Sequence, residues 1–170
     1  MKTDTFTASV PSAGHIAAGK YLTFTMAQEV YGIPVLKVRE IIKMLEITAV
    51  PQVPRHVKGV INLRGKVVPV VDLRLKFSLP PQPYTERTCI IVVDVALRGA
   101  RVMLGVVVDA VADVLNIGAE EIEPVPTFGE QVATDCMQGI ANVKGTVKIL
   151  LDLDRVFATD DAIGIRSSEK

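Results

Sequence analysis

Short apolar runs alternate with polar turns along most of this chain. The segments VVPVV at 67–71 and VMLGVVV at 102–108 are typical, with five and seven residues. Runs of this length that are rich in β-branched residues predict strands, because a helix needs a longer segment with a period near 3.6. We expect about five short strands in each half of the chain, closing on themselves. The predicted fold class is therefore all-β, with two small β-barrels packed side by side.

The two halves of the chain repeat one pattern. VKGVINLRGKVVPVVDL at 57–73 aligns with MQGIANVKGTVKILLDL at 137–153 at a constant offset of 80, with six of 17 positions identical. Upstream, YGIPVLKVREII at 31–42 aligns with LGVVVDAVADVL at 104–115 at an offset of 73, which places Gly32 over Gly105. A repeat of this length indicates two copies of one structural unit whose loops differ in length.

A tight turn is predicted inside each repeat. Asn62-Leu-Arg-Gly-Lys66 lies between two apolar runs, and Gly65 can adopt the positive φ that a hairpin turn requires, with Arg64 at the tip. Asn142-Val-Lys-Gly-Thr146 repeats this design. Pro69 lacks a backbone donor, which predicts that its strand lies at a sheet edge or carries a bulge.

Short helices are predicted at three places, near residues 55–58, after Asp72 and at residues 154–158. Asp72 and Asp152 hold the same position in the two repeats, and each precedes one of these helices. A carboxylate just before a helix accepts hydrogen bonds from its first N–H groups. We therefore expect each aspartate to be an N-cap.

The chain divides into four segments. Residues 1–19 and 158–170 are predicted to be flexible tails. Residues 20–86 are predicted to form the first barrel together with a proline-rich connection, and residues 87–157 the second barrel. The connection, SLPPQPYTE at 78–86, has three prolines in nine residues and cannot continue a central strand.

The charges balance overall but are unevenly placed. The 19 Lys and Arg equal the 19 Asp and Glu, and aromatic residues make up only 5%, which argues against a nucleic-acid binder. Residues 55–76 carry six basic residues and one acid, whereas residues 102–143 carry seven acids and no Lys or Arg. Two interpretations are open: an ordinary solvated surface, or opposed patches that orient association with partners and can build rings.

No catalytic or metal-binding arrangement is evident. GVINLRGK at 59–66 has five residues between its glycines where a phosphate loop has four, and Val67 stands where Ser or Thr is required. Asp72 and Asp152 invite comparison with the carboxylate pair of aspartic proteases, but neither is followed by the small hydroxyl residue and glycine of that turn. The two histidines are not at ligand spacing. The sequence therefore predicts no enzyme, no cofactor and no metal.

The cysteines and the apolar runs indicate the compartment. Cys89 and Cys136 are 47 residues apart, each with an apolar neighbour on at least one side, and are interpreted as buried, reduced thiols. The valine-rich runs fall far short of the ~20 residues that a membrane helix needs. The first residues lack the continuous apolar stretch of a secretory signal. We expect a cytoplasmic protein.

Arg64 has two interpretations. A charged side chain at a hairpin tip commonly faces solvent. Its guanidinium could instead form a bidentate pair with a carboxylate, for which Glu40 is a candidate. Because Asn62 and Gly65 fix the turn, the side chain would act from a rigid platform in either case.

Four segments of the chain resemble the CheW-type coupling proteins of bacterial chemotaxis: YGIPVLKVREI, HVKGVINLRGKVVPVVDLRLKF, LGVVVDAVADVL and QGIANVKGTVKILLDLDRVF. The similarity spans residues 20–157, and its N-L-R-G-x-x-V-P-V-V-D-L-R segment is specific. This resemblance implies two SH3-like five-stranded barrels with short helices. It also implies a non-enzymatic scaffold that joins methyl-accepting chemoreceptor tips to the regulatory domain of a CheA-type histidine kinase, with self-association in array rings.

The resemblance further implies which residues bind the receptor or the kinase. Arg64 would be a central contact, with Val38 and Glu40 from the L-K-V-x-E-I match. Gly105 and Val114 would line a groove between the barrels that takes the helical tip of the receptor, since apolar grooves accept helices. For Val38 and Val114, packing in the core is the alternative interpretation.

Two other functions stay open at this point. One is a small-molecule sensor of another chemosensory pathway, with its ligand held between the barrels. The other is a hydrolase that uses Asp72 and Asp152.

Overall fold

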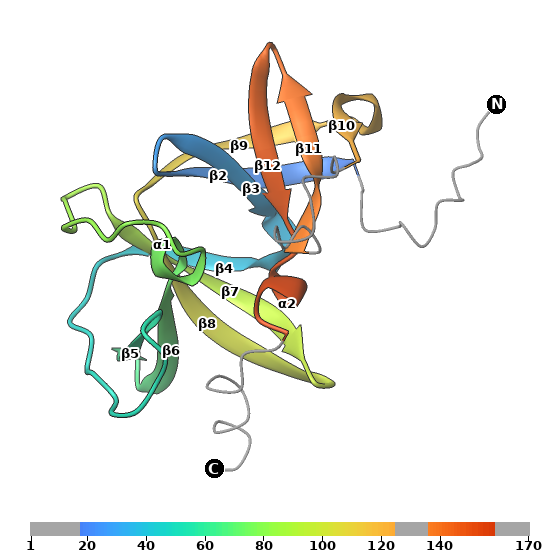
Figure 1. The fold of residues 1–170 in the computed structure, drawn as a ribbon. Coiled ribbons are helices and arrows are strands. Elements are labelled where there is room, and N and C mark those ends of the chain that lie inside the picture. Colours follow the sequence, from blue (N-terminus) through green and yellow to red (C-terminus); the bar gives the residue numbers. More distant parts are fainter. Residues whose placement is uncertain (1–17, 125–135, 159–170) are drawn as a thin grey trace.

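The computed structural model describes residues 18–124 and 136–158, which form two β-sheets side by side (Figure 1). The six-stranded sheet has the spatial order β10 (Ile122–Glu123), β11 (Met137–Val143), β12 (Thr146–Leu151), β3 (Glu29–Pro34), β2 (Gly19–Met26) and β9 (Ala110–Ile117). The five-stranded sheet has the order β4 (Val38–Lys43), β7 (Cys89–Leu97), β8 (Ala100–Val108), β6 (Lys66–Asp72) and β5 (Val57–Leu63). The helices are η2 (Val35–Lys37), α1 (Leu73–Lys76), η3 (Ala119–Glu121) and α2 (Leu153–Val156). The predicted all-β class with short helices is confirmed.

The two repeats exchange their first hairpins. The β2–β3 hairpin of the first repeat pairs with β9 and β12 of the second, and the β7–β8 hairpin of the second pairs with β4 and β6 of the first. The parallel pairs have the same register, with Leu150 opposite Gly32 and Val70 opposite Gly105. The sheets therefore do not follow the predicted division at residue 86, because each one combines strands from both segments.

In each sheet, the chain itself connects the two outermost strands. After β4, Thr48 exchanges two backbone hydrogen bonds with Val60 of β5, at 2.8 and 2.9 Å. After β9, η3 leads directly into β10, which pairs with β11. Among the described residues the hydrogen-bond ladders do not run all the way around either sheet, so each sheet curls toward closure without completing a barrel. The six-stranded sheet gains its extra strand because β10 is a two-residue strand, whereas its counterpart at Thr48 is a single bridge.

The largest hydrophobic core lies between the two sheets. Phe24 and Ile33 enter it from the six-stranded sheet, Val93 and Leu104 from the five-stranded sheet, and Phe157 from the end of α2. Each sheet also has a smaller cluster of its own. Because both sheets contribute to one core, their positions relative to each other are set by packing and not by the connecting chain alone.

The helix predictions are confirmed in two places and wrong in one. Helix α1 follows Asp72, whose carboxylate accepts from the backbone N–H groups of Arg74 and Leu75 at 3.0 and 3.4 Å. Helix α2 follows Asp152, whose carboxylate accepts from the N–H of Arg155 at 3.3 Å. Both aspartates are therefore N-caps. The helix predicted at 55–58 is wrong, because β5 already begins at Val57 and the strand ladder takes its backbone groups.

Pro69 lies in an interior strand, which corrects the prediction of an edge. Strand β6 is flanked by β5 and β8. Pro69 stands opposite Val60, and the ladder with β8 begins only at Val70, so the residue that lacks a donor is unpaired on one side. The irregularity lies in the partner strand instead, where the register shifts between Val57 and Gly59.

The predicted tails lie largely outside the described residues, although Gly19 is already part of β2. Within the described ranges, no helix is both long and apolar enough to cross a membrane.

Candidate functional site

The β5–β6 turn holds Arg64 in a fixed position. Arg64 and Gly65 have φ values of +53° and +87°, the pair of left-handed residues expected for a two-residue hairpin turn. The side-chain carbonyl of Asn62 accepts from the N–H of Gly65 at 2.7 Å, which ties the turn to the end of β5. Side chain and backbone together confirm the predicted rigid platform.

The guanidinium of Arg64 forms an ion pair with the carboxylate of Glu40 in β4. The Arg64 side chain is 70% exposed and that of Glu40 is 30% exposed, so the pair lies at the surface with one arginine edge open to solvent. The hydrogen bond to Glu40, reinforced by its negative charge, raises the pKa of Arg64 above its ordinary value, against a small opposing effect of desolvation. Each of the two interpretations of Arg64 therefore holds in part: the guanidinium pairs with Glu40 through one contact, Nη2 to Oε2, and not as the expected bidentate pair, while most of the side chain faces solvent.

The second repeat has the same turn without the same pair. Lys144 and Gly145 have φ values of +55° and +81°, and Lys144 occupies the position of Arg64. Asp113 occupies the position of Glu40 at the offset of 73. Within the described residues no ion pair joins Lys144 and Asp113, so the paired arginine distinguishes the first repeat.

Glu40 and Gly105 lie in one row of residues across the five-stranded sheet. Glu40 is opposite Val92, which is opposite Gly105, which is opposite Val70. A Cβ on Gly105 would lie 2.8 Å from Cγ2 of Ile90 and 3.4 Å from Cγ2 of Val70. Gly105 is thus buried against the small core of its own sheet. The structure gives this glycine a packing role and not a place on an open surface.

Val38 and Val114 differ in exposure. Val38 is partly buried and packs against the core between the sheets. Val114, on β9, is 56% exposed, which is high for a valine in a strand. The core interpretation therefore holds for most of the Val38 side chain, whereas Val114 is available to a partner.

Leu36 and Ile41 are exposed apolar residues that the sequence analysis missed. Leu36 is 96% exposed in η2, and Ile41 in β4 is 45% exposed, next in sequence to Glu40. The repeat offers a signal for Ile41, because the offset of 73 aligns it with Val114. No sequence signal separates Leu36 from a core leucine, since its exposure depends on the link between the sheets.

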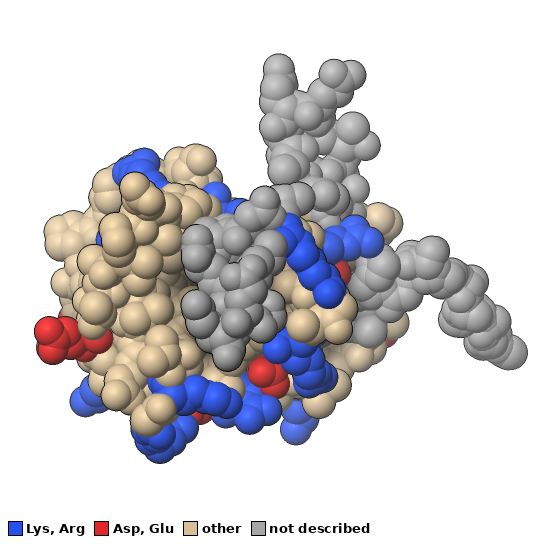
Figure 2. Space-filling view, turned by 90° about the horizontal axis from the view of Figure 1, so that it is seen from below, with Lys and Arg blue, Asp and Glu red and all other residues tan. Residues whose placement is uncertain are grey.

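The two sheets carry opposite charge. The basic segment 55–76 falls on β5, β6 and α1 of the five-stranded sheet. Figure 2 looks at this side of the molecule and shows many more Lys and Arg than Asp and Glu. The described acids of segment 102–143 lie in the link between β8 and β9, on β9, in η3 and on β10. Opposed patches of this kind orient encounters with charged partners.

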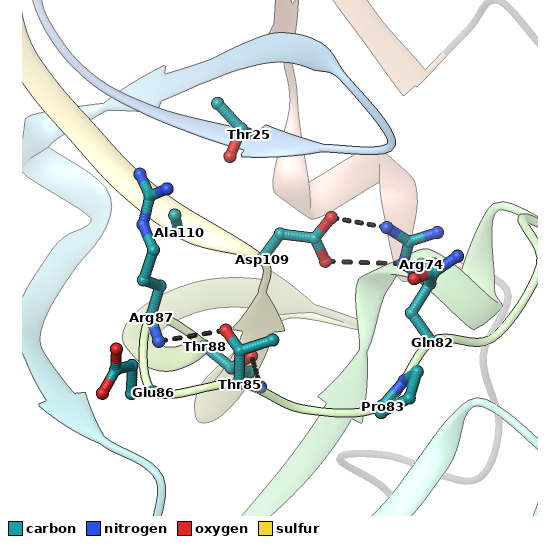
Figure 3. A pocket seen from close by; sticks show the side chains of 10 residues that line it. All are labelled: Thr25, Arg74, Gln82, Pro83, Thr85, Glu86, Arg87, Thr88, Asp109 and Ala110. Atoms are coloured by element: carbon teal, nitrogen blue, oxygen red, sulfur yellow. Dashed lines mark hydrogen bonds and ion pairs between the residues drawn. The ribbon is translucent and has the colours of Figure 1, made fainter.

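A cavity of about 360 Å³, lined mostly by residues with polar side chains, lies where the two sheets meet (Figure 3). Thr25 of β2 and Ala110 of β9 line it from one sheet, Arg74 of α1 from the other, and the segment 82–88 closes one side. Its most buried cation, Arg74, is already paired with Asp109. The cavity is the feature nearest to the sensor hypothesis, but two of its charged groups satisfy each other.

The groups that could carry chemistry are otherwise engaged. Asp72 caps α1 and also accepts from the hydroxyl of Tyr84 at 2.9 Å, while Asp152 caps α2. Cys89 and Cys136 are not joined in a disulfide and are partly buried, and burial raises the pKa of the Cys89 thiol despite a backbone hydrogen bond that lowers it. In the described part of the chain no cluster of His, Cys, Asp or Glu could hold a metal ion.

Comparison with known proteins gives one family. A family model for the CheW-like domain matches residues 20–161. The chain is 38% identical over 149 residues to a chemotaxis protein CheW of Klebsiella aerogenes, which covers 88% of this chain and 87% of that protein. It is 40% identical over 116 residues to a chemotaxis protein CheW of Bacillus subtilis, covering 68% and 71%. The crystal structure of the scaffolding protein TtCheW from Thermoanaerobacter tengcongensis is similar with a TM-score of 0.75 and 31% identity, covering 86% of this chain and 99% of that one.

Proposed function

This chain belongs to the CheW-like domain family, and we propose that it is a non-enzymatic scaffold that couples chemoreceptors to a CheA-type histidine kinase in chemotaxis. The observation that carries this conclusion is the family match over residues 20–161, together with a similar scaffolding protein of known structure. The two aspartates of the hydrolase hypothesis serve as helix caps, which accounts for both of them without a catalytic role.

At the level of residues, the proposed contact site is the Arg64–Glu40 platform. An arginine that is held on a rigid turn and is 70% exposed can bind a partner carboxylate with little loss of conformational entropy. Ile41, the next residue of β4, is also exposed, but successive strand residues alternate in direction, so its side chain lies on the opposite face from Glu40 and outside this platform. A rigidly held arginine is typical of an interface in which a few central residues supply most of the affinity.

For the receptor, the proposed surface includes Val114 and excludes Gly105. Val114 presents an exposed apolar group on the outer side of β9, which suits the apolar face of a helix. Gly105 supports the site only indirectly, by allowing β8 to pack closely. This revises the residue set expected from the resemblance.

The finer partner assignments belong to the same proposal. The kinase partner is its regulatory domain, the receptor partner is the cytoplasmic tip, and copies of the chain associate in rings, in the cytoplasm and without nucleic acid or membrane insertion. The opposite charges of the two sheets support head-to-tail association.

Reconstitution tests the function. A receptor fragment, the kinase and this protein are mixed, and kinase autophosphorylation is measured as the scaffold is titrated. If the scaffold binds its two partners at separate surfaces, a low scaffold concentration should increase the control of the kinase by the receptor. An excess of scaffold should abolish this control, because receptor and kinase are then bound by different scaffold molecules. A response that rises to a plateau without this decline would argue against a bridging role, and turnover by the protein alone would argue against a scaffold.

A small-molecule sensor is the second candidate, supported only by the cavity where the two sheets meet. Calorimetry against a panel of metabolites, with Arg87→Gln as the control variant, tests it. A saturable signal without affinity for the kinase would favour the sensor.

A further inference from the structure

Two ion pairs join the sheets, and each involves one of the two links that cross between them. Lys37 lies in η2, which leads from β3 to β4, and its ammonium donates to both carboxylate oxygens of Asp154 in α2 at 3.1 and 3.0 Å. Asp109 lies in the link from β8 to β9, and its carboxylate accepts from Nη2 and Nε of Arg74 in α1 at 2.5 and 3.4 Å (Figure 3). Each pair thus joins a crossing link to the helix that ends the other repeat.

Each carboxylate also accepts a backbone hydrogen bond from one of the exchanged hairpins. The N–H of Ala96 at the end of β7 donates to Oδ1 of Asp154 at 2.8 Å. The N–H of Ala27 in the β2–β3 turn donates to Oδ2 of Asp109 at 3.0 Å. The strand registers make Ala27 and Ala96 equivalent positions of the two repeats. Each set of three groups therefore joins a helix, a crossing link and a hairpin end. We call these two sets the clamps: Lys37, Asp154 and Ala96 form one, and Asp109, Arg74 and Ala27 form the other.

The two clamps have opposite polarity. Arg74 and Asp154 are equivalent at the offset of 80, yet one is basic and the other acidic. At the offset of 73, Asp109 of the second link aligns with Leu36 of the first link, which is uncharged. The charge of the first link is carried by the next residue, Lys37. In one clamp the helix supplies the acid, and in the other the link supplies it.

This polarity matters because a duplicated chain has an alternative topology. If each hairpin stayed with its own repeat, β3 would pair with β6, and α1 would meet the link of its own repeat. Arg74 would then face Lys37, and Asp154 would face Asp109. Both contacts would join like charges, whereas the observed exchange joins opposite charges twice. Contacts that are repulsive in the competing arrangement are an effective source of specificity.

We propose that Lys37, Arg74, Asp109 and Asp154 are positioning residues that select the exchanged topology and hold the two sheets in one relative orientation. For the binding of partners this inference rests on the proposed function, since a receptor that contacts both sheets needs that orientation. The clamps touch no partner themselves. They set the distance between the Arg64 platform on one sheet and Val114 on the other.

The test exchanges the charges of the two links. In Lys37→Glu combined with Asp109→Lys, both clamps join like charges in the exchanged topology, while the net charge of the chain is unchanged. Adding Arg74→Glu and Asp154→Lys restores two opposite pairs with inverted polarity. Nitroxide labels at two exposed positions report the distance between the sheets: Lys66→Cys at the start of β6 and Lys144→Cys in the turn between β11 and β12. In this background Cys89 and Cys136 are replaced by Ala. Electron-spin distance measurements are made on each full chain.

We expect one narrow distance distribution in the parent, a broadened or second distribution in the double variant, and a narrow one again in the fourfold variant. Receptor-fragment affinity should fall about fivefold or more in the double variant, since one exposed pair alone accounts for up to about that factor, and it should recover in the fourfold variant. An unchanged distribution in the double variant would overturn the proposal.

If neither charge variant folds, the neutral pair Lys37→Gln with Asp109→Asn decides, because the amide keeps an acceptor for the Ala27 N–H. Broadening there supports the clamps, and a parent-like distribution overturns them. Distances that follow the expected pattern while no variant, the parent included, binds the receptor fragment would reject the proposed function and leave the clamps in place.

Discussion

Arg64 and Glu40 join opposite ends of the five-stranded sheet. Glu40 belongs to β4, the first strand in the order, and Arg64 follows β5, the last. The same ends are joined through the backbone by Thr48 and Val60. The proposed contact residue therefore lies where the sheet curls toward closure, and the closure positions it.

Replacing Arg64 with Ala should separate binding from folding. The side chain is 70% exposed, so we expect the thermal midpoint to stay close to that of the parent. Capture of receptor or kinase in co-sedimentation should weaken roughly tenfold or more, as for a central interface arginine. Arg64→Lys is the matched control, because it keeps the charge and loses the planar fork. Parent-like capture by Arg64→Ala would remove the role assigned to this residue.

Replacing Gly59 with Ala should disrupt the closure of the five-stranded sheet. Gly59 has a φ of +140°, and a Cβ there would lie 2.0 Å from the carbonyl oxygen of Thr48. Because a backbone atom cannot yield as a side chain can, we expect a loss of roughly 3 kcal/mol or more in the free energy of unfolding, measured in urea. Gly99→Ala is the control, since its φ of +82° is also positive but nothing lies within 4 Å of the added Cβ. Equal losses in both variants would show that the contact with Thr48 is unimportant.

Replacing Gly105 with Ala tests the packing role of this glycine. The added Cβ would lie 2.8 Å from Cγ2 of Ile90, in a core that has no space to spare. We expect a destabilisation of about 1–3 kcal/mol in denaturant unfolding. Gly32→Ala, the equivalent change, should have a smaller effect, because its nearest contact is the end of the Leu150 side chain at 3.0 Å. A stable Gly105→Ala protein that fails to bind the receptor would instead restore the direct role implied by the resemblance.

Replacing Tyr84 with Phe tests how the proline-rich connection is held. The Tyr84 hydroxyl donates to Asp72 at 2.9 Å, and its loss should cost about 1 kcal/mol of unfolding free energy at neutral pH. Burial, followed by the hydrogen bond and the charge of Asp72, raises the pKa of Tyr84 above the ordinary 10.0. The protonated phenol is thus favoured in the folded state, and this contribution is present below pH 10 and lost as the pH rises above it.

The measurement for Tyr84 is the difference in stability between parent and variant at neutral pH and again above pH 10. The gap should narrow at the higher pH, because only the parent loses the Tyr84 contribution. The other tyrosines are present in both proteins and cancel. A gap that widens with pH would contradict the hydrogen bond to Asp72.

Local patterns predicted the elements of this fold well. The Asn-x-x-Gly turns, the N-caps at Asp72 and Asp152 and the strand-rich composition are properties of a few consecutive residues, and the structure confirms them. The helix expected at 55–58 failed because the ladder with β6 took those backbone groups. The edge expected at Pro69 failed because strand order depends on β8, which is distant in sequence.

The candidate site was predicted in part. The sequence left open whether Arg64 faces solvent or pairs with Glu40, and the curl of the sheet brings the two residues into a single contact while the Arg64 side chain stays 70% exposed. Gly105 was assigned to a groove, yet it is buried, and an added Cβ would meet Ile90 and Val70. Leu36 was not singled out, because its exposure follows from the link between the sheets.

By itself the sequence determined the strands, their turns, the twofold repeat and the family, since each is written in residues near one another or in a direct alignment. Only the tertiary structure decided that the repeats exchange hairpins, which side chains are buried between the sheets and which charges meet. The physical reason is that β3 pairs with β12, and β6 with β8, across long stretches of chain. Both possible partners of each strand carry the same local pattern, so the choice between them rests on contacts that exist only once the chain has folded.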